Sequence, residues 1–167
     1  MDEDDDHYGS IVLGISDALI EMTGVLAGLT FALKDLKLVA LSGLVTGIAA
    51  SLSMGASEFL SKRAESRDSL PIKAAFYTLA SYLFVVILMI SPYLIIEQQG
   101  FGLEPHILAL SLTLCIGVIV VAGFNKWISA KQNQPFFSRF LEMLGILAIV
   151  TSLSYAIGMG LASVIDI

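Results

Sequence analysis

Charged residues and cysteines are both scarce in this sequence. Asp, Glu, Lys and Arg make up 14% of the 167 residues, whereas a soluble domain carries about 25%. This shortage, with a hydrophobic share of 56% and a mean hydropathy of +0.85, excludes an ordinary soluble domain. The single cysteine, Cys115, excludes an intrachain disulfide and a thiolate metal cage. Because Cys115 lies in an apolar run, we expect it to pack as a small hydrophobic residue.

Long loops are also absent, and long apolar segments take their place. A membrane-spanning helix needs about 20 apolar residues. Segments of that kind occupy residues 11–33, 39–60, 74–96, 107–124 and 140–164. Each must satisfy its own backbone hydrogen bonds in lipid, so all of them should be helices. We therefore predict an all-α polytopic membrane protein, with an acidic N-terminal tail at residues 1–10 and one five-helix transmembrane domain at residues 11–167.

Basic residues are unevenly divided between the two ends of the predicted spans. Lys34 and Lys37 fall at one end, and the connection between the third and fourth segments has no basic residue. The other end holds Lys62, Arg63, Arg67, Lys73, Lys126, Lys131 and Arg139. By the positive-inside rule, this asymmetry places the N-terminus in the cytoplasm. An odd number of spans then leaves the C-terminus outside.

Two carboxylates interrupt the first apolar segment. Asp17 and Glu21 are four residues apart and therefore share a helix face. A charged side chain at the centre of a membrane helix costs about 2.5–3.5 kcal/mol on insertion scales. Ionisable residues inside a membrane usually face a bundle interior or a water-filled path. Asp17 and Glu21 are therefore our first candidates for function.

The second segment carries a methionine and another carboxylate with the same spacing. Met54 and Glu58 share a helix face, and the short link between the first two segments makes their helices antiparallel neighbours. Asp17 lies about 9 Å along the helix from the start of the first segment, and we expect Met54 at about the same depth. Met54 could instead serve only packing, and Glu58 could reach out to the membrane surface.

These side chains suit a transition-metal ion. Carboxylate oxygens bind divalent cations, and a thioether shifts preference toward softer metals than Mg²⁺. Burial without a cation favours the protonated carboxyl group, and metal binding releases that proton. A site that holds either protons or a metal ion could therefore exchange one for the other. Glu142, near the start of the fifth segment, is a further candidate ligand, although it could simply favour a helix N-terminus.

Two stretches of the sequence resemble the vacuolar iron transporter family. They are GISDALIEMTGVLAGLTFAL in the first segment and SLSMGASEFLSKRAE in the second. The resemblance implies a homodimeric five-helix antiporter that moves Fe²⁺ out of the cytosol in exchange for protons. It carries the ion-path roles of the family over to Asp17, the aspartate of S-D, and to Met54, the methionine of S-M-G.

The chain departs from the eukaryotic pattern of that family in three places. One of them is Met22, which stands where those members have a proline after the S-D motif. The link between the second and third segments, SKRAESRDSLPIK, is too short for the acidic cytosolic metal-collecting domain. Thr46 stands where those members have an acidic residue early in the second helix. Glu21 and Glu58 could supply the missing carboxylates. The resemblance therefore implies a compact prokaryotic version in the inner membrane.

We expect an exporter of Fe²⁺ rather than an enzyme, because the sequence has no nucleophile–base pair inside the spans. Mn²⁺, Co²⁺ or Zn²⁺ could also be the cargo, as in a Mn²⁺ or broad divalent cation exporter. A non-transporting membrane subunit is the alternative from a different class. The expected metal ligands are Asp17, Glu21, Met54, Glu58 and Glu142. The expected partners are lipid, a second copy of the chain and divalent metal ions, with no permanent cofactor and no nucleic acid.

Overall fold

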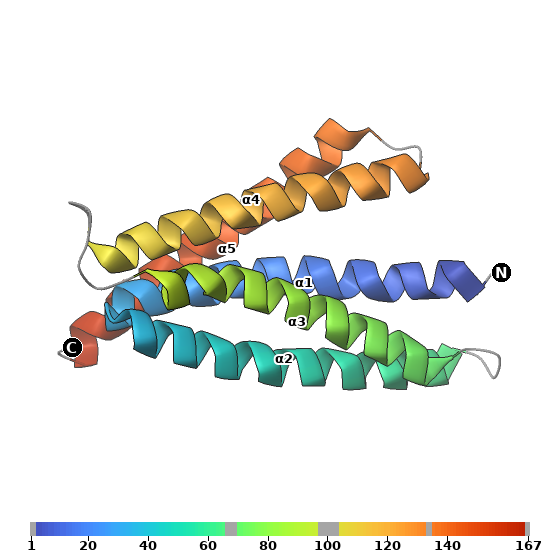
Figure 1. Cartoon of the computed structure of the whole chain (residues 1–167), viewed down its shortest axis with the longest axis horizontal. Coiled ribbons are helices and arrows are strands. Elements are labelled where there is room, and N and C mark those ends of the chain that lie inside the picture. Colours follow the sequence, from blue (N-terminus) through green and yellow to red (C-terminus); the bar gives the residue numbers. More distant parts are fainter. Residues whose placement is uncertain (1–2, 66–69, 97–103, 133–134, 166–167) are drawn as a thin grey trace. The chain divides into compact units, whose positions relative to one another are not determined.

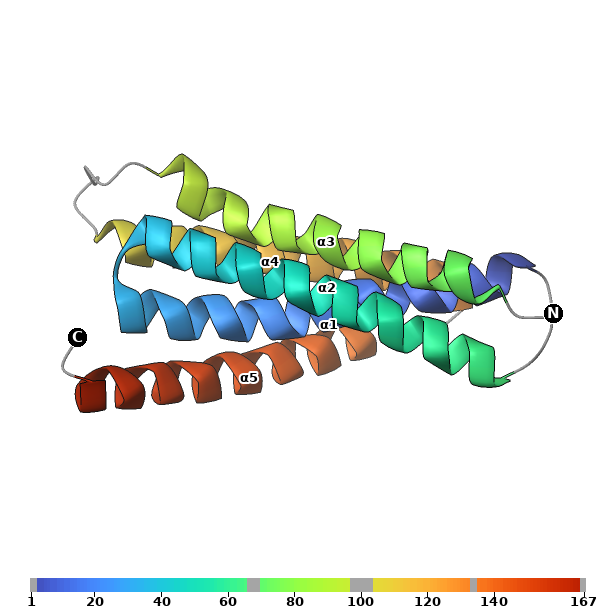
Figure 2. The ribbon, with the colours of Figure 1, turned by 90° about the horizontal axis from the view of Figure 1, so that it is seen from below.

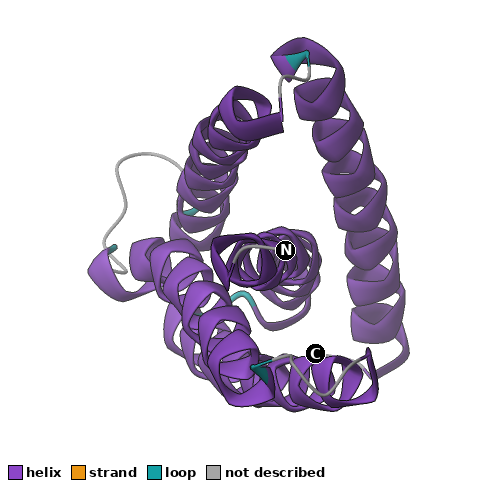
Figure 3. Cartoon of the chain, turned by 90° about the vertical axis from the view of Figure 1, so that its right-hand side faces the viewer, coloured by secondary structure: helices purple, strands orange, loops and turns teal. Residues whose placement is uncertain are grey.

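The computed structural model describes residues 3–65, 70–96, 104–132 and 135–165, and in these ranges the chain is helical apart from short loops (Figures 1 and 3). The helices are α1 Glu3–Leu33, α2 Leu36–Glu65, α3 Pro71–Ile95, α4 Pro105–Gln132 and α5 Phe136–Ile165. All five are long and apolar enough to cross a membrane. The predicted all-α, multi-pass architecture is therefore confirmed. Arg67, which contributes to the predicted orientation, lies outside the described residues.

Most helices extend beyond the apolar segments that predicted them. The helix α1 begins at Glu3, so helical backbone runs through the acidic residues that precede the candidate span Tyr8–Leu33. The helix α4 runs on to Gln132, eight residues past the predicted end at residue 124. Hydropathy locates only the part of a helix that needs lipid, whereas backbone hydrogen bonding can continue into water. Pro71 begins α3, because proline lacks the N–H that a first helical residue leaves unused.

The turn between α1 and α2 consists of Lys34 and Asp35. Lys34 has a φ of 54°, and its N–H donates to the carbonyl of Thr30 at 3.1 Å. A left-handed residue at this place ends the helix by satisfying one of its last carbonyls. Asp35 then accepts the N–H of Leu38 through Oδ1 at 2.9 Å, which is the usual capping bond at a helix start. The two helices are therefore joined by a defined turn.

The chain divides into two compact units, which we describe separately. Unit 1 comprises Met1–Ala18 and Leu44–Leu88, and unit 2 comprises Leu19–Gly43 and Met89–Ile167. In unit 1 the lengths of α2 and α3 lie side by side in both ribbon views (Figures 1 and 2). Gly47 faces the side chain of Val86, and a Cβ at this glycine would meet it at 2.5 Å. Small residues of this kind let membrane helices approach closely.

Unit 2 is held by neutral polar contacts and close helix packing. Thr30 and Tyr93 hydrogen bond through their hydroxyl groups, and Thr113 donates to the carbonyl of Met89 at 2.9 Å. Between α4 and α5, the buried Asn125 donates to the sulfur of Met143 at 3.4 Å. These bonds satisfy polar groups that cannot hydrogen bond to water inside a membrane.

Cys115 also belongs to unit 2, where we expected it to pack as a small hydrophobic residue. The cysteine is exposed on α4. It follows the buried Thr113 by two residues, which turns it to a different face of the helix. An apolar run cannot by itself tell which face of a membrane helix meets lipid, because both faces are apolar.

Candidate functional site

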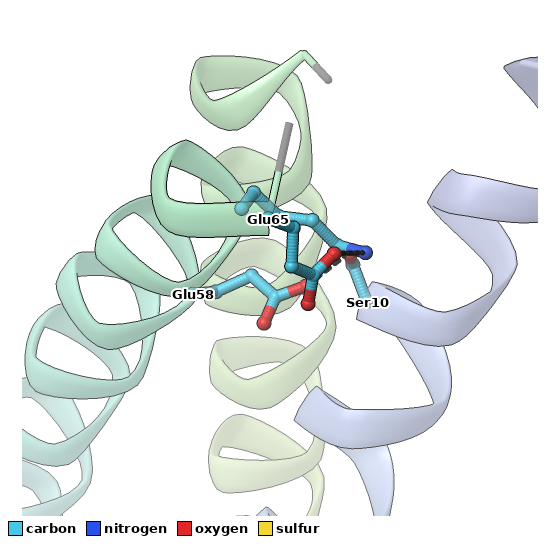
Figure 4. Close-up of polar contacts among 4 residues, drawn as sticks. Ser10, Glu58 and Glu65 are labelled. Carbon is cyan, nitrogen blue, oxygen red and sulfur yellow. Dashed lines mark hydrogen bonds and ion pairs between the residues drawn. The ribbon is translucent and has the colours of Figure 1, made fainter. Parts of the chain in front are cut away.

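A buried hydrogen bond joins α1 to α2 in unit 1. Ser10 donates from Oγ to Oε1 of Glu58 at 2.7 Å, and Glu58 is only 8% exposed (Figure 4). A third helix joins the same contact, because Thr78 of α3 donates from Oγ1 to the backbone carbonyl of Ser10 at 3.1 Å. A buried carboxylate needs such partners, since it has lost its contact with water. The alternative that Glu58 reaches the membrane surface is therefore not the arrangement in this structure.

Two further charged residues follow Glu58 on α2. Lys62 and Glu65 form an ion pair, with Nζ 3.1 Å from Oε2, at the end of the helix (Figure 4). They stand four and seven residues after Glu58, so all three share one helix face. Glu65 is 58% exposed, and an exposed pair of this kind contributes little to stability. This face of α2 therefore carries an ion pair at the helix end, followed further into the helix by the buried carboxylate of Glu58.

The Ser10–Glu58 bond fixes the register of α1 against α2 within unit 1. Since the two helices are antiparallel, residues further along α1 lie opposite residues earlier in α2. Asp17 then stands level with Ser51, and Met54 stands level with Gly14. Met54 is therefore about 4.5 Å nearer than Asp17 to the end of the bundle that carries Glu58. Our expectation of equal depth for Asp17 and Met54 was wrong by about three residues.

Glycines of the two family-like motifs bring α3 close to both helices. A Cβ on Gly14, the glycine of GISD, would collide with the carbonyl of Thr78 and the hydroxyl of Ser81. A Cβ on Gly55, which follows Met54, would lie 3.2 Å from the carbonyl of Ala75 and from Leu79. Glycine permits such close approach because it has no side chain. Each motif therefore contains a candidate ligand, Asp17 or Met54, and a glycine that lets its helix pack closely against α3.

The predicted ligands differ in their surroundings. Asp17, Glu21 and Met54 are half-buried, whereas Glu142 is exposed on α5. Asp17, Met54 and Glu58 belong to unit 1, and Glu21 and Glu142 belong to unit 2. Among the residues that the structure describes, no three His, Cys, Asp or Glu side chains gather closely enough to hold a metal ion.

Sequence reasoning missed Ser10 and Thr78, which hold Glu58 in place. Ser10 precedes Gly14 by four residues, yet the side chain of Ser10 bonds Glu58 of α2 while Gly14 contacts α3. Nothing in the sequence singles out Thr78 from the other hydroxyl residues of α3.

Comparison with known proteins bears on the same part of the chain. The family model described as the VIT family matches residues 8–69. Over this range the chain is similar to the VIT family. The matched range contains most of α1 and all of α2, with Asp17, Glu21, Met54 and Glu58. A search among curated proteins found no match.

The similarity to the VIT family suggests a metal ion transporter. The family consists of metal ion transporters rather than enzymes, which agrees with a chain of five potential membrane spans. The match ends before α3 begins at Pro71. The helices recognised by the family model are therefore those that hold most of the candidate ligands, while α3 supports them from outside the matched range.

Proposed function

We propose that this chain exports Fe²⁺ from the cytoplasm in exchange for protons. The observation that carries the proposal is the match at residues 8–69, which covers four of our five candidate ligands. The position of Asp17 supports it, because this half-buried carboxylate lies about 14 Å along the helix from Tyr8, well inside the apolar span. A carboxylate at such a depth is rarely kept without a function.

The proposed path follows the order that the register gives. Glu58 comes first, Met54 lies about 6 Å deeper, Asp17 about 4.5 Å deeper again, and Glu21 about 6 Å further along α1. Glu58 would receive the metal ion, Met54 and Asp17 would select and hold it, and Glu21 would pass it on. The thioether favours Fe²⁺ over Mg²⁺, which prefers oxygen ligands and keeps its water.

Exchange with protons follows from the chemistry of buried carboxylates. When the metal ion leaves, the carboxylates lose their counter-charge, and the protonated form becomes the favourable one. The next metal ion must displace those protons before it can bind. Outward movement of metal would therefore bring protons into the cell.

The exposed carboxylate of Glu142 suggests how a second copy would contribute. Glu142 lies six residues after the start of α5. Only 11% of the most apolar stretch of this helix is buried within the chain. A carboxylate turned toward lipid is costly, so this face would gain from being covered. We include a homodimer in the proposal, with Glu142 as an additional ligand near the surface of the membrane.

Reconstitution into liposomes tests the proposal directly. Vesicles that hold a pH-sensitive dye and the purified chain receive Fe²⁺, Mn²⁺, Co²⁺ or Zn²⁺ on one side. We expect Fe²⁺ flux with an opposite proton flux. Faster Mn²⁺ flux would favour the Mn²⁺ or broad exporter, and metal flux without a pH change would indicate a uniporter. If no metal moves faster than in empty vesicles, the chain is a non-transporting subunit.

A further inference from the structure

An open apolar groove of about 390 Å³ lies between α2 and α3 in unit 1. Its floor is formed where Gly55 approaches Ala75 and Leu79, the close contact described above. Phe59 and Phe76 line its sides. Phe76 is 65% exposed, so the groove opens on the outer surface of the chain. A volume of this size falls within the range of about 300–1,000 Å³ that small-molecule sites occupy.

The depth of the groove matches one leaflet of a membrane. Gly55 lies about 15 Å along α2 from Glu65, and Leu79 lies about 12 Å along α3 from Pro71. The hydrocarbon core of a bilayer is about 30 Å thick, and each headgroup layer adds about 5–8 Å. The groove therefore begins near headgroup depth, where α2 ends and α3 begins, and extends into the acyl layer.

Two exposed basic residues stand at the shallow end of this groove. Arg63 follows Phe59 by four residues on α2, and Lys73 precedes Phe76 by three residues on α3. These spacings place each cation on the helix face that carries the adjacent groove residue, one turn nearer the surface. The combination of an apolar groove and two cations at its mouth complements a lipid with a negatively charged headgroup.

We propose that this groove binds one anionic phospholipid, with an acyl chain between Phe59 and Phe76 and the phosphate at Arg63 and Lys73. Neutral lipids fit the apolar part but gain nothing from the two cations. Each exposed cation strengthens binding to an anionic headgroup by about fivefold, so the pair should favour an anionic lipid by about 30-fold. This inference does not depend on which metal the chain carries.

Native mass spectrometry of the purified full chain tests the lipid site. The delipidated protein is titrated with phosphatidylglycerol and with phosphatidylcholine of the same acyl chains. We expect one phosphatidylglycerol to bind about 30-fold more tightly than phosphatidylcholine. Equal binding of the two lipids by the wild-type chain would overturn the proposal, because the cations would then have no role.

Two sets of variants locate the site. Ala56→Phe fills the groove and should weaken binding of both lipids at least tenfold, whereas Ala49→Phe, an equally exposed position two turns away and outside the groove, should not. Arg63→Gln with Lys73→Gln should remove only the preference for phosphatidylglycerol. The double variant Lys37→Gln with Lys126→Gln removes the same amount of charge elsewhere. It should keep the preference for phosphatidylglycerol.

Two results with these variants would refute the lipid site. The first is unchanged phosphatidylglycerol binding by Ala56→Phe. The second is conversion of a dimer to a monomer by Ala56→Phe without loss of lipid, because the groove would then be a contact between copies of the chain. The oligomeric mass is read in the same spectra, so the two results are distinguished in one measurement.

Discussion

The two units of this protein satisfy buried polar groups in different ways. In unit 1 the central contact involves an ionisable side chain, since Glu58 accepts a hydrogen bond from Ser10. In unit 2 the contacts described above join neutral groups, such as Thr30 with Tyr93 and Asn125 with Met143. Both arrangements meet the need of a membrane interior for paired polar atoms. Only the first includes a carboxyl group, which can carry a charge.

This difference distinguishes a contact that can respond to ions from contacts that cannot. A neutral pair holds two helices together equally well whether or not protons or metal ions are present. A hydrogen bond to a carboxylate is altered when the carboxyl group gains a proton or when its oxygen binds a metal ion. We therefore expect the Ser10–Glu58 contact of unit 1 to respond to transport, and the neutral contacts of unit 2 to be indifferent to it.

The largest effect should come from removing the carboxylate of Asp17. Asp17→Asn keeps the shape of the side chain but cannot exchange a proton for a metal ion, so flux in liposomes should fall to that of empty vesicles. Asp35→Asn is the matched control, because asparagine caps a helix about as well as aspartate and this residue lies in the α1–α2 turn. Metal flux near the wild-type rate in Asp17→Asn would remove Asp17 from the path.

A smaller effect should follow when the Ser10–Glu58 contact is altered. Glu58→Gln should raise the apparent KM for metal about tenfold with a smaller change in kcat, because it removes the first carboxylate of the path while leaving the deeper ligands. Ser10→Ala keeps the carboxylate but removes its hydrogen-bond donor, so it should raise KM less. Both are measured by initial flux against metal concentration.

Glu65→Gln provides the control for that series, since Glu65 lies on the same face of α2 but is exposed at its end. We expect it to leave KM unchanged. If Glu58→Gln also leaves KM unchanged but lowers the melting temperature, then Glu58 serves only to hold the helices together. If Ser10→Ala behaves as wild type while Glu58→Gln does not, Ser10 has no positioning role.

Replacing the thioether should have a moderate effect on metal preference. Met54→Leu nearly conserves volume, so stability should change by less than about 1.5 kcal/mol. Affinity for Fe²⁺ and Co²⁺ should fall severalfold, with little change for Mn²⁺, because the softer ligand is lost. Calorimetric titration measures this, with Met159→Leu on α5 as the control. Unchanged Fe²⁺ and Co²⁺ affinities would assign Met54 to packing alone.

The smallest effect should come from the neutral contact of unit 2. Tyr93→Phe removes the hydroxyl that pairs with Thr30. Hydrogen bonds between membrane helices contribute about 0.6 kcal/mol on average, so the melting temperature should fall slightly and by the same amount at pH 6 and pH 8. Flux should not change. A strong loss of transport in Tyr93→Phe would contradict the division between the two units.

The sequence was sufficient to predict the number, order and approximate positions of the helices. Hydropathy and length decide whether a segment can span lipid. The ends were less predictable, as the extension of α1 to Glu3 shows, because helices continue where the side chains are polar. Cys115 illustrates a second limit, since apolar periodicity does not orient a helix that has lipid on one side.

The candidate site was predictable in its residue types but not in its register. Asp17 and Met54 stand out by chemistry and by their motifs, whereas their relative depth depends on which side chains meet across the helices. That register became visible only through the bond between Ser10 and Glu58. A serine–glutamate pair separated by 48 residues leaves no pattern in a single sequence.

Gly14 acts as a spacer whose influence reaches a side chain that it does not touch. Its missing Cβ sets the distance between the backbones of α1 and α3 at Thr78. Thr78 in turn bonds the carbonyl of Ser10, and the side chain of Ser10 bonds Glu58. Any side chain at position 14 would push α3 away and loosen this relay. The absence of a side chain at Gly14 on α1 thereby affects how tightly the carboxylate of Glu58 on α2 is held in its position.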